Sequence, residues 1–261
     1  IPKGLVGSEM CIRDRDRVVS NGNHAEYVVV NQNLCTRIPD NTDIKEASFT
    51  VLGSIALHGL RLSETSLGSK VVVIGLGIIG QLVCRLAEAQ GSEVIGIDPD
   101  TKRTDMSANF YTSVEEANMT NVDSVIITAA TSSNEPIEVA TKIARNKAKI
   151  VVVGDIPLNI SRNDFYYKEL ELVVSKSYGP GRYDKQYEIL GKDYPIEYVR
   201  WTENRNFEAF IKLLSQNQIH LLDLVTEEVS FENAPSIYKK FSGEDKPLSI
   251  VLRYDNKSEP K

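Results

Sequence analysis

Between residues 70 and 175 the chain alternates unbroken apolar runs with stretches that carry apolar residues at helical spacing. Unbroken runs rich in valine and isoleucine are typical of strands buried on both faces of a parallel sheet. The predicted strands cover residues 71–74, 94–98, 125–128, 150–154 and 170–175, and the predicted helices between them cover 78–90 and 135–145. Strands that alternate with helices predict an α/β fold, with a doubly wound parallel sheet and right-handed crossovers.

The pattern is less regular on either side of this region. Residues 28–30 are a short β-branched run between polar turn residues, which predicts a strand. Helical spacing over 43–62 and 207–214 predicts two helices, and 248–254 predicts a late strand. The segment 178–206 holds several glycines, prolines and aromatic residues. We expect it to be a long ordered loop, which in a compact domain is usually functional.

A glycine-rich turn joins the first predicted buried strand to the helix after it: Gly75-Leu76-Gly77-Ile78-Ile79-Gly80. This is the G-x-G-x-x-G pattern of dinucleotide-binding units, in which an acidic residue follows at a spacing of about 20 residues. Asp98 ends the next predicted strand near that spacing. The first glycine permits a tight turn, the second lets the backbone approach a pyrophosphate, and the third lets helix and strand pack closely. The pattern predicts a dinucleotide site at the N-terminus of the helix.

Asp98 also indicates which dinucleotide is bound. A carboxylate at this position accepts hydrogen bonds from the adenosine ribose and repels a 2′-phosphate, so NAD is favoured over NADP. Lys102 and Arg103 lie just beyond and weaken this preference. Ala129 and Gly154 follow two other predicted strands, so we expect their backbone to line the nicotinamide crevice. A methyltransferase that binds S-adenosylmethionine is an alternative, although its loop usually lacks the third glycine.

Three side chains are candidates for catalysis. Tyr178 and Arg182 follow the strand predicted over 170–175, whose carboxyl end should face the crevice. Arg182 could hold a phosphate or carboxylate through two hydrogen bonds. The alternative is that this loop folds on itself or forms a subunit contact. His58 lies on the helix predicted over 43–62, near the expected nicotinamide, and simple packing on that helix is its alternative role.

Composition narrows the class of protein. Lys plus Arg number 30 and Asp plus Glu number 36, giving a net charge of −6 without the basic excess of nucleic-acid-binding proteins. The hydrophobic share of 41% and the charged share of 25% are ordinary for a soluble globular protein. No apolar run approaches the roughly 18 residues of a membrane helix. The 3 cysteines are widely spaced, which favours a reducing cytoplasm. We expect a cytoplasmic protein with a small-molecule substrate and neither nucleic-acid nor membrane partners.

Several short segments carry a family resemblance: Asp16-Arg17-Val18, His24-Ala25-Glu26-Tyr27-Val28, Glu46-Ala47-Ser48-Phe49, and Asn233-Ala234-Pro235 before Tyr238. Together with the glycine-rich turn they resemble the medium-chain dehydrogenase/reductase superfamily, which is alcohol dehydrogenase-like. The resemblance implies the end of a GroES-like β-rich catalytic domain over 16–55, an NAD-binding Rossmann domain over 56–206, and a C-terminal return over 207–261. It implies an oxidoreductase that transfers a hydride between NAD(H) and an alcohol or carbonyl. We also expect a homo-oligomer.

A narrower resemblance rests on residues 177–184, 193–195 and 198–203. These segments are similar to the bi-domain oxidoreductases, in which such a dehydrogenase is fused to a Gfo/Idh/MocA-like sugar oxidoreductase. The resemblance implies a sugar or sugar-nucleotide substrate in polysaccharide biosynthesis, with a fused or adjacent second enzyme. It also implies that the chain is a fragment, whose activity on its own is an open question. A non-catalytic NAD-binding scaffold or sensor for the fused partner is a further alternative.

Two more expectations follow from the resemblance. Zinc members of the superfamily place a ligand cysteine where Leu52 or Gly53 stands, and neither can bind metal. We therefore expect a zinc-independent member with no metal site. Residues 1–15, which include Glu9-Met10-Cys11-Ile12-Arg13-Asp14-Arg15, resemble a translated sequencing-library adapter. The alternative is an ordinary disordered terminus.

Overall fold

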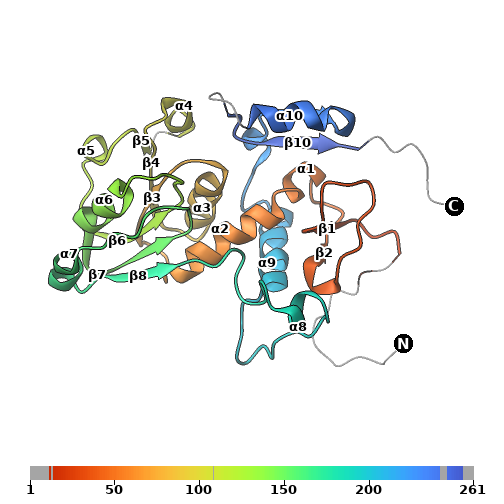
Figure 1. The fold of residues 1–261 in the computed structure, drawn as a ribbon, viewed down its shortest axis with the longest axis horizontal. Helices are drawn as coiled ribbons and strands as arrows, with labels where there is room; N and C mark the ends of the chain where they lie inside the picture. The colour runs from red at the N-terminus through yellow and green to blue at the C-terminus, as the bar shows by residue number, and fades with distance from the viewer. Residues whose placement is uncertain (1–11, 13, 108, 242–245, 255–261) are drawn as a thin grey trace.

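A six-stranded parallel sheet is the largest sheet of the computed structural model, which describes residues 12, 14–107, 109–241 and 246–254 (Figure 1). The strand order is β5-β4-β3-β6-β7-β8. The strands are β3 (Lys70–Ile74), β4 (Glu93–Ile97), β5 (Phe110–Tyr111), β6 (Val122–Ile127), β7 (Ala144–Val152) and β8 (Glu171–Val174). Every pair of neighbours is parallel. The doubly wound α/β fold is therefore confirmed.

Helices cover both faces of this sheet. Helices α2 (Thr50–Leu62) and α3 (Ile78–Ala89) pack on one face, and α6 (Glu135–Ile143) and α7 (Arg162–Lys168) lie on the other. Successive strand residues alternate between the two apolar layers: Val71 and Val73 join the α2–α3 layer, and Val72 and Ile74 join the α6 layer. Burial on both faces explains why the strand sequences are apolar without interruption. Short helices α4 (Thr101–Thr104) and α5 (Val114–Ala117) flank β5.

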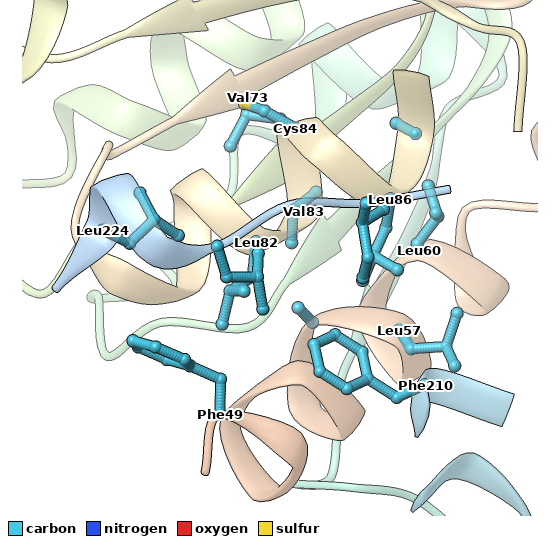
Figure 2. Packing of buried hydrophobic residues seen from close by; sticks show 14 of the residues in the cluster. Phe49, Leu57, Leu60, Val73, Leu82, Val83, Cys84, Leu86, Phe210 and Leu224 are labelled. Atoms are coloured by element: carbon cyan, nitrogen blue, oxygen red, sulfur yellow. The ribbon is translucent and has the colours of Figure 1, made fainter. Parts of the chain in front are cut away.

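Helix α2 links the sheet to the rest of the molecule. It follows the short α1 (Ile44–Ala47) and packs on α3 and on α9 (Glu203–Ser215), as Figure 2 shows for Leu57, Leu82 and Phe210. The contact with α9 depends on Gly53, because a Cβ atom there would lie 2.1 Å from Cε2 of Phe210. No side chain larger than hydrogen fits between the two helices at this point. The helix also continues through the boundary predicted between residues 55 and 56.

Two small sheets lie outside the six-stranded sheet (Figure 1). One pairs β1 (Val18–Ser20) with β2 (Cys35–Arg37) in antiparallel register, and the other pairs β9 (Glu227–Ser230) with β10 (Ile250–Arg253) in parallel register. The remaining short helices are η1 (Gln32–Leu34), α8 (Lys185–Glu188), η2 (Leu222–Leu224), η3 (Phe231–Asn233) and α10 (Ala234–Lys240). In the described part of the chain, every helix is too short or too polar to cross a membrane.

Some predicted elements are wrong or misplaced. The strand predicted over 28–30 is absent: Val28 covers Gly22, and the side chain of Val29 is fully exposed. A β-branched run without a neighbouring strand to pair with does not become one. Helix α9 begins at Glu203 and not at 207, because the Thr202 side chain accepts a hydrogen bond from the N–H of Arg205 and caps it earlier. Most of the adapter-like segment 1–15 lies outside the described residues.

The Gly53–Phe210 contact leads to a stability prediction. Gly53→Ala should lower the free energy of unfolding by about 1–3 kcal/mol, because the fully buried Phe210 ring has to shift. Urea unfolding measures the change. Lys212→Ala, at an exposed position of α9, is the control and should change stability little. Equal midpoints for Gly53→Ala and the unaltered chain would show that α2 and α9 do not pack in this way.

Candidate functional site

The carboxyl ends of β3 and β6 meet at the centre of the sheet. From β3 the chain continues to β4 on one side, whereas from β6 it continues to β7 on the other. A reversal of this kind opens a crevice beyond the strand ends, and ligands of doubly wound sheets bind in it. The N–H groups of Thr128 and Ala129 both donate to the carbonyl of Ile74, at 2.8 and 3.1 Å. The glycine-rich turn and Ala129 therefore lie side by side at this point.

The geometry of the glycines fits a dinucleotide cradle. Gly75 has φ +97°, and a Cβ atom there would lie 2.5 Å from the nitrogen of Ala129. A Cβ atom on Gly80 would lie 1.9 Å from the carbonyl oxygen of Gly75. Gly77 differs, since a Cβ atom there would meet only the guanidinium of Arg103, at 3.0 Å. Gly77 is also the N-cap of α3 and has no side chain to satisfy the first N–H groups of the helix. Those groups remain available to a phosphate.

Asp98 holds the turn in place. Its side chain is 9% exposed, and Oδ2 accepts a hydrogen bond of 2.7 Å from the N–H of Leu76. Oδ1 accepts a second one of 2.9 Å from the N–H of Asp100. An ionised carboxylate has about four acceptor positions, so both oxygens can still accept from ribose hydroxyls. Arg103 lies beside Gly77 and pairs with Asp100 at 3.2 Å. The site therefore combines a buried carboxylate, that of Asp98, with a cation, Arg103, beside the N-terminus of α3.

The end of β7, helix α2 and the chain after β8 converge on the crevice. A Cβ atom on Gly154 would lie 2.0 Å from the carbonyl oxygen of Ala129, and one on Gly59 would lie 2.6 Å from Cγ2 of Val153. His58, the residue before Gly59, lies against Gly179. Burial, together with the charge of Arg61, lowers the pKa of His58 to about 4. The imidazole is therefore neutral at pH 7, with one ring nitrogen unprotonated.

Tyr178 and Arg182 lie together, next to the chain that follows β1. Tyr178 is 5% exposed, and its hydroxyl accepts a hydrogen bond of 3.2 Å from Nδ2 of Asn21. Burial raises the pKa of Tyr178, so the phenol keeps its proton. Nη1 of Arg182 pairs with Glu188 at 2.7 Å, and the guanidinium lies over the rings of Tyr178 and Tyr183. This internal pairing favours a loop that folds on itself over an Arg182 that is free to hold a ligand.

Glu203 belongs to the same cluster, and the sequence analysis missed it. The residue is fully buried; Oε1 lies 3.4 Å from Nδ2 of Asn21, and Oε2 has no hydrogen-bond partner. Burial raises the pKa of Glu203 to about 8; the charge of Glu188 adds to this rise and that of Arg182 opposes it. The carboxyl is therefore mostly protonated at pH 7. The sequence carries no signal for the burial of Glu203, because a glutamate in the first turn of a helix is usually exposed and stabilised by the helix dipole.

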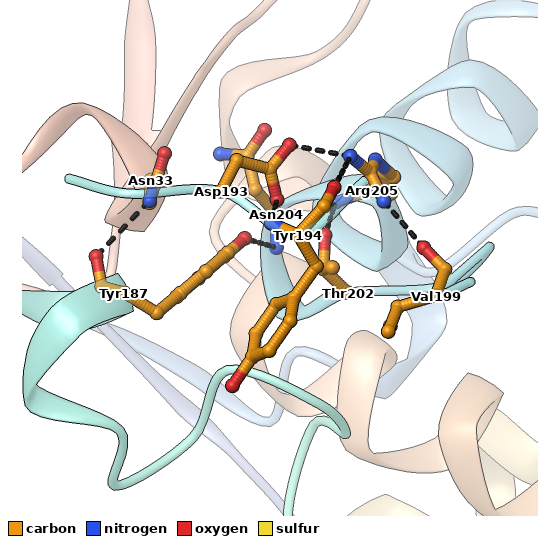
Figure 3. A network of polar contacts seen from close by, with 8 residues as sticks. All are labelled: Asn33, Tyr187, Asp193, Tyr194, Val199, Thr202, Asn204 and Arg205. Carbon is orange, nitrogen blue, oxygen red and sulfur yellow. Dashed lines mark hydrogen bonds and ion pairs between the residues drawn. The ribbon is translucent and has the colours of Figure 1, made fainter. Parts of the chain in front are cut away.

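A polar network fastens the segment 178–206 to the rest of the molecule (Figure 3). Arg205 pairs with Asp193 and donates to the carbonyls of Val199 and Tyr194. Tyr187 accepts from the N–H of Asn204 through its hydroxyl and from Nδ2 of Asn33 through its carbonyl. These bonds hold the predicted loop in one conformation without a long helix or strand.

The fold and the turn define an α/β domain of the dinucleotide-binding class. The family model described as "D-isomer specific 2-hydroxyacid dehydrogenase, NAD binding domain" matches residues 53–164. The match contains both the glycine-rich turn and Asp98. It supports NAD as the cofactor, in agreement with the sequence prediction.

Several known proteins that are similar to this chain are dehydrogenases or reductases. The chain is 26% identical over 169 residues to the 2-dehydro-3-deoxy-L-galactonate 5-dehydrogenase of Pseudoalteromonas atlantica, covering 59% of this chain and 49% of that protein. It is 22% identical over 235 residues to a probable D-xylulose reductase A of Aspergillus terreus, covering 84% of this chain and 61% of that protein. It thus spans about half to three fifths of the length of these relatives.

Solved structures show the same fold. Galactitol-1-phosphate dehydrogenase from Escherichia coli has a TM-score of 0.69 at 21% identity, over 88% of this chain and 66% of that one. Alcohol dehydrogenase TADH from Thermus sp. ATN1 has a TM-score of 0.65 at 18% identity, over 85% and 61%. These comparisons give no support to a fused Gfo/Idh/MocA-like domain or to an adapter origin of residues 1–15.

The different surroundings of two glycines give a matched test of the cradle. Gly77→Ala should leave stability within about 0.5 kcal/mol, since its methyl group meets only the flexible Arg103 side chain. It should weaken NADH binding at least tenfold, because the methyl group occupies the path of the pyrophosphate. Gly80→Ala should instead destabilise the fold, since its methyl group overlaps the carbonyl of Gly75. Calorimetric titration and thermal unfolding measure the two effects. Unchanged NADH affinity in Gly77→Ala would contradict the cradle.

The buried Glu203 predicts a pH dependence of stability. Its folded-state pKa of about 8 lies above the ordinary 4.5, so the folded chain binds this proton more tightly than the unfolded chain. The Glu203 contribution to the free energy of unfolding is therefore full below about pH 4.5 and falls as pH rises to about 8. Glu203→Gln removes this pH dependence. The free energy of unfolding of the variant, relative to that of the unaltered chain, should therefore rise between about pH 4.5 and pH 8. Urea unfolding between pH 5 and pH 8 tests this, with the exposed Glu88→Gln as control. Parallel stability curves for Glu203→Gln and the unaltered chain would refute it.

Proposed function

We propose that this chain is the coenzyme-binding part of a dehydrogenase that transfers a hydride between NAD(H) and an alcohol or carbonyl of a sugar or polyol. The observation that carries the proposal is the open cradle at Gly77, next to Asp98 at the centre of the sheet. The relatives named above support it, because their names describe dehydrogenases and reductases of sugars and polyols.

In this proposal each part of the crevice has a separate task. The N-terminus of α3 at Gly77 holds the pyrophosphate, and Asp98 binds the adenosine ribose. The backbone at Ala129 and Gly154 lines the nicotinamide side of the crevice. NAD supplies the hydride acceptor when it is bound. The chain itself provides orientation and the movement of a proton.

His58 and Tyr178 are the proposed proton-handling groups. The neutral imidazole of His58 takes the hydroxyl proton of an alcohol and returns it to the oxygen of a carbonyl in the reverse direction. Tyr178 keeps its phenolic proton and accepts from Asn21, so it can donate to the reacting oxygen and polarise it. The guanidinium of Arg182 stacks on the ring of Tyr178 and thereby orients the tyrosine.

We further propose that catalysis does not depend on zinc. The position that the family resemblance gives to a zinc-ligand cysteine is held by Leu52 or Gly53, and neither side chain offers a donor atom. A sugar-nucleotide substrate in polysaccharide biosynthesis, a homo-oligomer and a cytoplasmic location extend the proposal. These three points rest on the family resemblance and on composition alone.

The first test compares three cofactors and one pair of variants. In calorimetric titrations the chain should bind NADH at least tenfold more tightly than NADPH and should not bind S-adenosylmethionine. NAD-dependent oxidation of galactitol or xylitol should survive dialysis against a zinc chelator. His58→Gln should lower kcat about 100-fold or more at unchanged NADH affinity. His24→Gln, at an exposed position beside β1, is the matched control.

Each outcome decides a separate part of the proposal. Binding of S-adenosylmethionine without NADH would replace the dehydrogenase by a methyltransferase. NADH binding without oxidation of any alcohol would favour a scaffold or sensor. Loss of activity on chelation, restored by zinc, would refute the zinc-independent mechanism. Equal kcat values for His58→Gln and His24→Gln would remove His58 from the mechanism.

A further inference from the structure

Trp201 lies between two arginines. The guanidinium carbon of Arg61 is 3.4 Å from the centre of the indole ring, and that of Arg200 is 3.8 Å from it. Both distances are close to the contact limit of about 3.5–4.0 Å between carbon atoms. One face of the ring cannot hold two groups so near its centre, so the arginines occupy opposite faces. Their guanidinium carbons are therefore at most about 7 Å apart.

Arg61 and Trp201 are held by well-packed elements. Arg61 lies at the end of α2, and its Nε donates a hydrogen bond of 3.0 Å to Oδ1 of the fully buried Asn206. Trp201 directly precedes Thr202, the buried N-cap of α9. Stacking on the indole fixes the plane of each guanidinium. The donor edges of the two arginines are thus oriented before any ligand arrives.

The positive charge of this pair is not balanced by a nearby carboxylate. Within the described parts of the chain, no carboxylate oxygen lies within the 4.0 Å ion-pair distance of either guanidinium. Glu208 feels the charge of Arg200 without forming an ion pair with it. Burial, together with the charge of Arg200, lowers the pKa of Arg61 to about 10. Two like charges held this close favour an anion beside them, at the edge of the indole ring.

The pair lies next to the crevice. Arg61 is three residues after His58 on α2, and residues at this spacing are neighbours on a helix surface. His58 lies against Gly179, and the adjacent Gly59 contacts Val153 at the end of β7. The arginines are therefore one helical turn from the side chain proposed to handle the proton.

We propose that Arg61 and Arg200 form an oxyanion-binding site at the edge of Trp201, and that its ligand is the phosphate or carboxylate of an acidic sugar-derived substrate. Planar guanidinium groups bind both oxyanions through paired hydrogen bonds, and the separation of the two arginines allows one oxyanion to accept from both. Among the similar proteins, one is named for a phosphorylated polyol and another for a sugar acid. The assignment of the anion to the substrate rests on the proposed function, whereas the anion site itself does not.

The chain contains 1 tryptophan beside 11 tyrosines, so fluorescence excited at a wavelength that tyrosine does not absorb reports on Trp201 alone. Inorganic phosphate, galactitol 1-phosphate and galactonate should each change the fluorescence saturably at constant ionic strength, and neutral galactitol should not. Arg200→Gln, at an exposed position, should weaken the response at least tenfold without loss of folding. Arg162→Gln is the matched control, since Arg162 also lies over an aromatic ring, that of Tyr166, at 4.7 Å. An absent response, or equal titrations for Arg200→Gln and Arg162→Gln, would overturn the site.

A kinetic measurement tests whether the anion that binds at this site belongs to the substrate. The measured quantity is kcat/KM for galactitol 1-phosphate divided by kcat/KM for galactitol. Arg200→Gln should lower this ratio at least tenfold, and Arg162→Gln should leave it unchanged. An unchanged ratio for Arg200→Gln would overturn the assignment to the substrate. A fluorescence response to phosphate in a chain that oxidises neither alcohol would support the anion site and reject the proposed function. Oxidation of both alcohols without any fluorescence response would support the proposed function and reject the anion site.

Discussion

The packing of α2 between the sheet and α9 is the contact on which the rest of the structure depends. Gly53 lets the Phe210 ring of α9 approach the helix, and Gly59 lets the side chain of Val153 approach it from the end of β7. The same helix carries His58 toward the crevice and Arg61 toward Trp201. A helix that packs closely on two sides positions its remaining side chains within narrow limits, because protein interiors are densely packed.

Polar side chains are concentrated on one side of this helix. Tyr178 is buried where the chain before α9 meets the chain after β1, and Glu203 and Asn206 of α9 are buried beside it. Burying polar groups costs free energy unless they are hydrogen-bonded, and Glu203 limits this cost by remaining protonated. Titratable groups with displaced pKa values gather at functional sites more often than elsewhere. These buried polar groups lie beside Gly179, which in turn lies against His58.

The central fold could be predicted from local pattern, and the boundary region could not. The runs at 71–74 and 125–127 are apolar throughout because both faces of the sheet are covered, and this left a clear signal. The run at 28–30 is equally apolar but has no neighbouring strand to pair with, so its apolar pattern wrongly predicted a strand. The segment 178–206 could be recognised as an interruption, but its conformation depends on contacts with Asn33 and Asn21, which are far away in the chain.

The amino-acid sequence by itself determined the strand–turn–helix unit and its chemistry, because Gly75, Gly77 and Asp98 act through backbone conformation and fixed spacing along the chain. Only the tertiary structure decided that Glu203 is buried, that Arg182 pairs with Glu188, and that Arg61 and Arg200 share the ring of Trp201. The physical reason is that pKa values and ion pairing depend on desolvation and on distances between residues remote in sequence. Neither quantity is encoded in the local pattern of apolar and polar positions.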